Sequence, residues 1–146
     1  MNTPVSFELA KLLKEKGFDI PTQRYYEHAL TSKKDSETND YTGSFGWKKG
    51  ETNLSSGYFK NNYGMADLSD KNWYMCSAPT IAEVVMWLYE KHQIWIETPF
   101  WDSKFRIKVV DIKNETVLKG IDFNQFNTPT EAYEEAIKYT LKNLIP

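Results

Sequence analysis

Two histidines and one cysteine are the side chains best suited to nucleophilic or metal chemistry: His28, His92 and Cys76. A zinc site takes three or four Cys, His or carboxylate ligands at characteristic spacings, and this sequence shows no such spacing. Cys76 precedes an expected helix start, where a thiol pKa can fall. We favour instead a buried thiol packed beside Trp73 and Met75. We interpret His92 as a structural residue at a helix end, where the dipole favours a cation. We therefore expect no catalytic residue, no metal site and no cofactor.

Two other patterns point only weakly to chemistry. The run "GSFGWKKGE", which begins at Gly43, is glycine-rich like a phosphate-binding loop. It departs from the G-x-x-x-x-G-K-[ST] pattern because Lys49 precedes Gly50 instead of following it. Glu83 and Glu90 lie two turns apart on one line of an expected helix, which is typical of a solvated face. The sequence therefore predicts neither a nucleotide site nor a carboxylate pair for acid–base catalysis.

Aromatic residues are the unusual feature, at 15% of the chain with 5 Trp, 9 Tyr and 8 Phe. Many of them crowd into the irregular first half. The favoured interpretation is that large side chains complete the core of a small domain. The alternative is an exposed surface that anchors a partner protein or stacks on bases. In that case we expect the contacts in the polar, glycine-rich stretch, at Trp47, Tyr58, Phe59 and Tyr63, with a weakly positive rim from Lys48, Lys49 and Lys60.

Three helices must position these residues. The first is predicted within residues 6–18, with Ser6 as N-cap and Gly17 at the C-terminal end. The second starts at Pro79 or Thr80, where Thr80-x-x-Glu83 forms a capping box. It is apolar nearly all round, which indicates a buried central helix. The third starts with the capping box Thr128-x-x-Glu131 and extends to residue 144, with Glu134 and Lys138 as a favourable ion pair.

Strands fill most of the rest. Short aromatic runs between turn-forming residues predict strands near Tyr25 and Trp73. The segments "QIWIET", "FRIKVVDI" and "ETVLKG" predict an antiparallel meander. In the second segment Phe105, Ile107 and Val109 alternate with Arg106 and Lys108, the period of a strand with one buried face. We expect an α+β fold in which three helices pack on an antiparallel sheet, with the C-terminal meander followed by the last helix.

Length and composition limit the broader class. A chain of 146 residues with 40% hydrophobic and 26% charged residues predicts one domain, spanning residues 1–146. A single cysteine excludes an internal disulfide, and no apolar run approaches a membrane span. The N-terminal stretch also lacks the pattern of a signal peptide. We therefore expect a cytoplasmic protein. The net charge of −2 and the absence of a basic stripe disfavour nucleic acid as the main partner.

The order of three segments resembles a known family. "SFELAKLLKEKGFD", "SAPTIAEVVMWLYEKHQIWIE" and "TPTEAYEEAIKYTLKNLI" together resemble a family of small uncharacterised proteins encoded by Bacteroides-type bacteria and their phages or other mobile elements. The resemblance covers the first helix and most of residues 76–145, and its most specific part is Ser-Ala-Pro-Thr-x-Ala-Glu. It implies an intracellular setting and carries no activity and no catalytic residue with it.

These observations favour a non-enzymatic accessory or adaptor protein that binds another protein, a second copy of the chain being one such partner. The alternative is a nucleic-acid-binding accessory factor of a phage or mobile element, which would use the aromatic half of the chain. An enzyme is the third hypothesis.

Overall fold

The structure is a computed structural model that describes residues 2–32, 48–61, 73–120 and 125–146. Its helices and strands follow the order α1 (Phe7–Glu15), β1 (Thr22–Ala29), β2 (Thr52–Phe59), β3 (Trp73–Ser77), α2 (Ile81–His92), β4 (Ile94–Glu97), β5 (Phe100–Trp101), β6 (Lys104–Phe105), β7 (Lys108–Asp111), β8 (Thr116–Lys119) and α3 (Pro129–Asn143). The predicted α+β class is confirmed.

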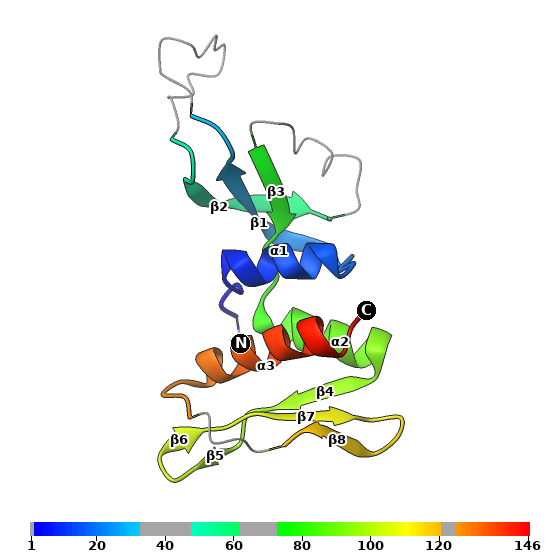
Figure 1. The fold of residues 1–146 in the computed structure, drawn as a ribbon. Helices are drawn as coiled ribbons and strands as arrows, with labels where there is room; N and C mark the ends of the chain where they lie inside the picture. The colour runs from blue at the N-terminus through cyan, green and yellow to red at the C-terminus, as the bar shows by residue number, and fades with distance from the viewer. Residues whose placement is uncertain (1, 33–47, 62–72, 121–124) are drawn as a thin grey trace.

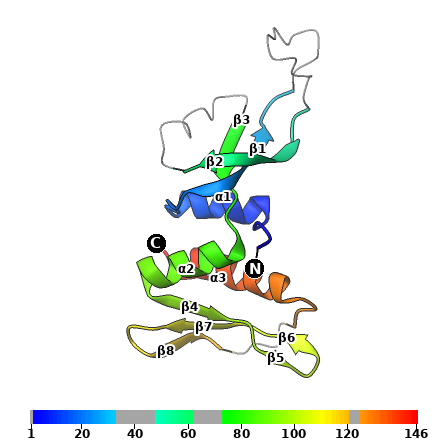
Figure 2. The same ribbon diagram turned by 180° about the vertical axis from the view of Figure 1, so that it is seen from behind.

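The elements form stacked layers (Figure 1). One antiparallel sheet, of order β2-β1-β3, lies at one end of the molecule, and a second, of order β4-β7-β8, lies at the other. The helices fill the space between them, with α1 beside the first sheet and α2 and α3 against the second, as the view from behind also shows (Figure 2). Among the described residues, the strands therefore make two three-stranded sheets around the helical layer and a separate two-stranded sheet, β5–β6, where the sequence predicted one sheet.

Local capping chemistry explains where the helices begin and end. At the start of α2, the Thr80 amide donates to the Glu83 carboxylate, and the Glu83 amide donates to the Thr80 hydroxyl. Thr128 and Glu131 form the same capping box at the start of α3. After α1, the Phe18 amide donates to the Leu13 carbonyl over 2.9 Å while Gly17 adopts a φ of 82°. That left-handed conformation suits glycine and closes the helix. The predicted caps at these three places are confirmed.

The C-terminal meander is also confirmed, with one addition. β4 pairs with β7 and β7 with β8, all antiparallel, and Ile96 lies opposite Val109 on the face toward the helices. A short hairpin, β5–β6, is inserted between β4 and β7. It projects at the side of the second sheet (Figure 1).

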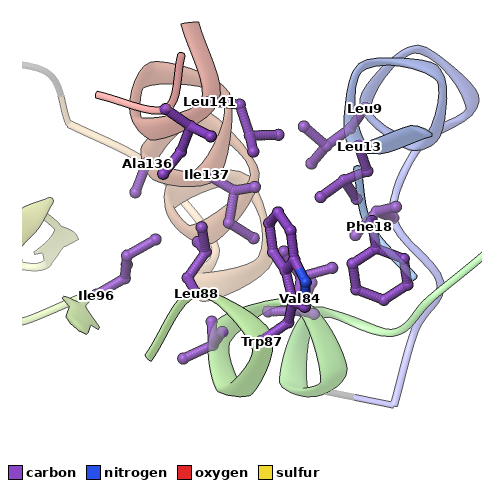
Figure 3. Packing of buried hydrophobic residues seen from close by; sticks show 14 of the residues in the cluster. Leu9, Leu13, Phe18, Val84, Trp87, Leu88, Ile96, Ala136, Ile137 and Leu141 are labelled. Carbon is purple, nitrogen blue, oxygen red and sulfur yellow. The ribbon is translucent and has the colours of Figure 1, made fainter. Parts of the chain in front are cut away.

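A single cluster of buried side chains joins the layers (Figure 3). Leu88 lies at the centre of α2 and is fully buried, and Ile137 points from α3 toward α2. Leu9 and Leu13 of α1 approach the same cluster from the other side. The helical layer therefore forms the core that both sheets cover.

Some details differ from the sequence predictions. Met86 and Tyr89 are exposed, so α2 is central without being buried all round. Arg106 was placed on the exposed side of its strand but is buried, because it precedes β7 and lies beside the β5–β6 hairpin. Glu134, which was predicted to pair with Lys138, accepts a hydrogen bond from the backbone amide of Ser6 over 2.6 Å. Lys138 forms its ion pair with Glu135. Ser6 occupies the N-cap position without a capping hydrogen bond from its side chain.

In the part of the chain that the structure describes, no helix combines the length and the apolar character needed to cross a membrane.

Candidate functional site: an aromatic hairpin

The structure describes only two of the four aromatic residues predicted as partner contacts, and these two differ in exposure. Trp47 and Tyr63 lie outside the described residues. Tyr58 is 61% exposed, whereas Phe59 is only 6% exposed. The ring of Phe59 stacks on Tyr25 with centroids 5.2 Å apart. Phe59 is thus a core residue, and its expected role as an exposed contact is wrong.

Gly57 makes this stack possible. A Cβ at this position would approach the Tyr25 ring to 3.4 Å, and the φ of 148° is one that side chains with a Cβ rarely adopt. The Tyr25 ring can therefore lie across β2 and reach Phe59. This contact between two strands is a long-range effect that the local pattern of "GYF" does not reveal.

The residues considered for nucleophilic chemistry are held in structural contacts. Cys76 is fully buried, and burial raises the pKa of its thiol to about 12, although Lys14 and Lys11 act in the opposite direction. The His28 ring stacks on Phe7 at 4.7 Å, and its Nδ1 forms a 2.7 Å hydrogen bond with Thr52. A thiol with so high a pKa remains protonated near neutral pH and is a poor nucleophile.

His92 is structural, as expected, but it does not favour the charged form. Its ring packs edge-on against Trp87 with centroids 4.8 Å apart. Burial, and then the neighbouring Lys91, lower the pKa of His92. The expectation that this helix end favours a charged His92 is therefore wrong. Among the described residues, no group of three His, Cys, Asp or Glu side chains is arranged to hold a metal ion.

The "GSFGWKKGE" stretch lies largely outside the described residues. In its described end, Gly50 has a φ of 90° and its amide donates to the Ala29 carbonyl, which closes the connection into β2. Glu83 takes part in the capping box of α2, so its carboxylate has a structural role.

A cleft of about 660 Å³ separates α1 from α3. Leu9, Leu12 and Phe126 provide its apolar part. Its remaining lining mixes both signs of charge, with Lys11 beside Glu8 and Lys138 beside Glu135. The lining holds five glutamates and three lysines in all, so the cleft carries a small excess of negative charge.

The most exposed large aromatic side chains among the described residues lie on the β5–β6 hairpin. Phe100 is 64% exposed and Trp101 is 67% exposed. Successive residues of a strand point to opposite faces, so the two rings project from opposite sides of the hairpin. Phe105 lies opposite Phe100 and Lys104 opposite Trp101. The hairpin is therefore a narrow wedge with one large exposed ring on each face.

The turn of this hairpin is tight and conformationally costly. Asp102 and Ser103 connect the strands with φ values of 51° and 58°. Two successive left-handed residues are the geometry of a two-residue turn that matches the twist of the strands. The left-handed region costs most non-glycine residues roughly 1–2 kcal/mol, and it costs Asp less, because its short polar side chain can form local hydrogen bonds. Contacts of the hairpin with the rest of the protein must therefore offset this cost.

Several hydrogen bonds fix the base of the hairpin. Phe105 and Phe126 exchange two backbone hydrogen bonds of 3.0 Å, and the Arg106 amide donates to the Pro99 carbonyl over 2.9 Å. The Lys104 ammonium donates to the side chain of Asn127. Phe126 and Asn127 immediately precede α3, so the hairpin is attached to the start of that helix.

Arg106 supports the exposed indole. Its guanidinium carbon lies 5.6 Å from the centroid of the Trp101 ring. A cation over an aromatic face is stabilising, and more so where the cation has lost part of its hydration. Arg106 is buried, so the exposed Trp101 ring contacts a cation that has lost part of its hydration.

Sequence reasoning missed this site because its local signals are weak. "PFWDSKF" has no Asn-Gly or Asp-Gly pair to indicate a hairpin. The short polar pair Asp102-Ser103, between Phe100-Trp101 and Lys104-Phe105, was the one available indication of a turn.

In comparisons with known proteins, no protein-family model, no curated protein and no solved structure matches the chain.

Proposed function

We propose that the protein is a non-enzymatic adaptor that binds another protein by inserting the β5–β6 hairpin into an apolar groove of that partner. The observation that carries the proposal is the exposure of Phe100 and Trp101 on the two faces of one anchored hairpin. Large aromatic side chains that enter partner pockets dominate the energy of many interfaces. A wedge with a ring on each face suits a groove with two apolar walls.

The attachment of the hairpin to the rest of the protein supports this role. Its base is tied to the start of α3 by backbone hydrogen bonds, and Trp101 rests against Arg106. Because the base of the hairpin is already attached to the rest of the protein, binding loses less loop entropy than it would for an unattached loop. The strained Asp102-Ser103 turn is consistent with a shape retained for contact.

Nucleic acid is the alternative partner, since exposed rings beside Lys104 and Arg106 could stack on bases. The charges around the hairpin include Asp102 and the Glu97–Lys108 ion pair of 3.1 Å, so the positive charge is partly offset. Strong binding to single strands combines stacking rings with a continuous positive groove. The mixed charge here favours a protein.

The test compares the wild type with the double variant Phe100→Ala/Trp101→Ala. Val117→Ala is the matched control, because Val117 is an exposed apolar residue of the second sheet away from the hairpin. Tagged proteins capture partners from cells that encode the chain, and the captured protein is then purified for titration. Circular dichroism and thermal melting first establish that all three proteins are folded.

We expect one partner to bind the wild type and Val117→Ala equally, and the double variant at least about tenfold more weakly. Equal binding to all three proteins would overturn the proposal. Binding of a fluorescent single-stranded DNA that is lost only in the double variant would also overturn it, in favour of the nucleic-acid alternative.

A further inference from the structure

The cleft between α1 and α3 has two chemically different ends. The Ser6 amide, at the start of α1, donates to Glu134 in the first half of α3 over 2.6 Å. The Lys16 ammonium, just past the end of α1, donates to the Ile145 carbonyl, just past the end of α3, over 2.9 Å. The two helices therefore run in the same direction, as Figure 1 also shows. Both helix starts lie at one end of the cleft.

The excess negative charge lies at that end. Two of the five lining glutamates form ion pairs with lysines of their own helix, at 3.9 and 4.0 Å. Glu131 and Glu134, in the first half of α3, instead accept backbone amides, which carry no net charge. Toward the other end, Glu15 and Lys142 have opposite charges. The helix starts contribute only about half a positive charge each, so this end of the cleft favours a cationic group.

Apolar side chains lie beside this charge. Leu9 and Leu12 of α1 line the cleft together with Phe126, which precedes α3. Leu12 and Phe126 are only half-buried, so a ligand that covers them removes apolar surface from water. The cleft volume of about 660 Å³ is typical of ligand sites. A ligand that fits has apolar groups next to its cationic group, as a peptide segment does and a polyamine does not.

We infer that the cleft binds a segment of another protein in which apolar side chains flank an arginine or a lysine. The basic side chain faces Glu134, and the apolar side chains cover Leu12 and Phe126. Glu134 is itself half-buried, so water and salt screen an ion pair there less than one at an exposed position. The cleft is a different surface from the hairpin, and this inference does not rest on the proposed function.

Three small probes test this assignment: acetyl-Leu-Arg-Leu-amide, the same peptide with glutamine in place of arginine, and spermidine. Each probe is titrated into the isotope-labelled protein, and the NMR chemical shifts of the backbone amides report where and how tightly it binds. Glu134→Gln removes the charge and keeps an oxygen that can accept the Ser6 amide. Glu90→Gln is the matched control, because Glu90 is an exposed glutamate of α2. The amide spectra also establish that both variants are folded.

We expect the arginine peptide to shift the amide signals of Leu12 and Phe126. Replacing its arginine with glutamine should weaken binding to the wild type and to Glu90→Gln about three- to fivefold. The two peptides should bind Glu134→Gln equally, because the charge that distinguishes them has been removed. Spermidine should bind the wild type more weakly than the arginine peptide does, because it covers less of the apolar surface.

The inference would be overturned if neither peptide shifted any signal up to its solubility limit, or if the largest shifts lay on another face. If Glu134→Gln preferred the arginine peptide as strongly as Glu90→Gln does, Glu134 would not select the ligand. Spermidine that bound as tightly as the arginine peptide, with the same shifts, would identify a general cation site and not a peptide site.

Discussion

At the scale of single residues, Asn61 links three parts of the chain. Its side-chain amide donates to the Phe18 carbonyl at 3.1 Å and to the Ser77 hydroxyl at 2.7 Å, while its oxygen accepts from the Ser77 amide at 2.8 Å. The side chain is buried, so it supplies partners that water cannot reach. It therefore connects the end of β3 with the segment that follows α1.

We predict that Asn61→Ala lowers the free energy of unfolding by about 1–3 kcal/mol, because buried donors and acceptors lose their partners. Urea unfolding followed by circular dichroism measures the change. Asn53→Ala, an exposed asparagine of β2, is the control and should change the free energy by less than about 0.5 kcal/mol. Equal effects of the two substitutions would show that the Asn61 network contributes little.

His92 gives the protein a pH dependence of predictable sign. Burial, and then Lys91, lower its pKa in the folded state below the ordinary 6.5. As the pH falls below 6.5, the unfolded chain therefore takes up a proton before the folded protein does. Stability contributed by the neutral ring is present above this pH and decreases as the pH falls toward the folded-state pKa.

We predict that the wild type loses more unfolding free energy than His92→Gln when the pH is lowered from about 7.5 to about 5.5. Denaturant titrations of both proteins at each pH provide the comparison. Parallel losses in the two proteins would mean that His92 does not contribute to the acid sensitivity.

At the scale of elements, α2 shows how local and long-range information differ. Its start at Thr80 could be predicted because the capping box uses residues only three positions apart. The periodicity also identified Val84 and Leu88 as buried. The exposure of Met86 and Tyr89 could not be predicted, because it depends on how far α3 and β4 extend over the helix.

We predict that Leu88→Ala destabilises the protein by about 2–5 kcal/mol, since it leaves a cavity between α2 and its neighbours. Met86→Ala, on the exposed side of the same helix, should cost less than about 0.5 kcal/mol. Chemical denaturation of the two variants compares a buried and an exposed position on one helix. If Leu88→Ala cost no more than Met86→Ala, α2 would not be the central helix.

The strands show the same limit of sequence reasoning. The meander of β4, β7 and β8 was predictable because its partners are near one another in the chain. The pairing of β1 with both β2 and β3, which leaves that sheet separate from the meander, depends on contacts between distant segments. The aromatic hairpin was missed for a third reason: its turn, Asp102-Ser103, has φ values of 51° and 58° but lacks the glycine that usually marks such a turn.

At the scale of the whole molecule, two sheets depend on one helical core. Buried residues of α1, α2 and α3 form a continuous cluster with Cys76 of β3 and with Ile96 and Val109 of the second sheet. A side chain in the middle of this cluster should therefore stabilise both ends of the molecule. Ile137 is such a side chain, fully buried on α3 and pointing toward α2 (Figure 3).

We predict that Ile137→Ala lowers the hydrogen-exchange protection of the central strands β1 and β7 by the same amount, about 2–5 kcal/mol. Core amides exchange through global unfolding when a protein opens as one cooperative unit. Val117→Ala, exposed on β8, should leave both strands unchanged. If β7 lost protection while β1 kept it, the first sheet would unfold independently. The shared cluster would then not couple the two sheets, although it lies between them.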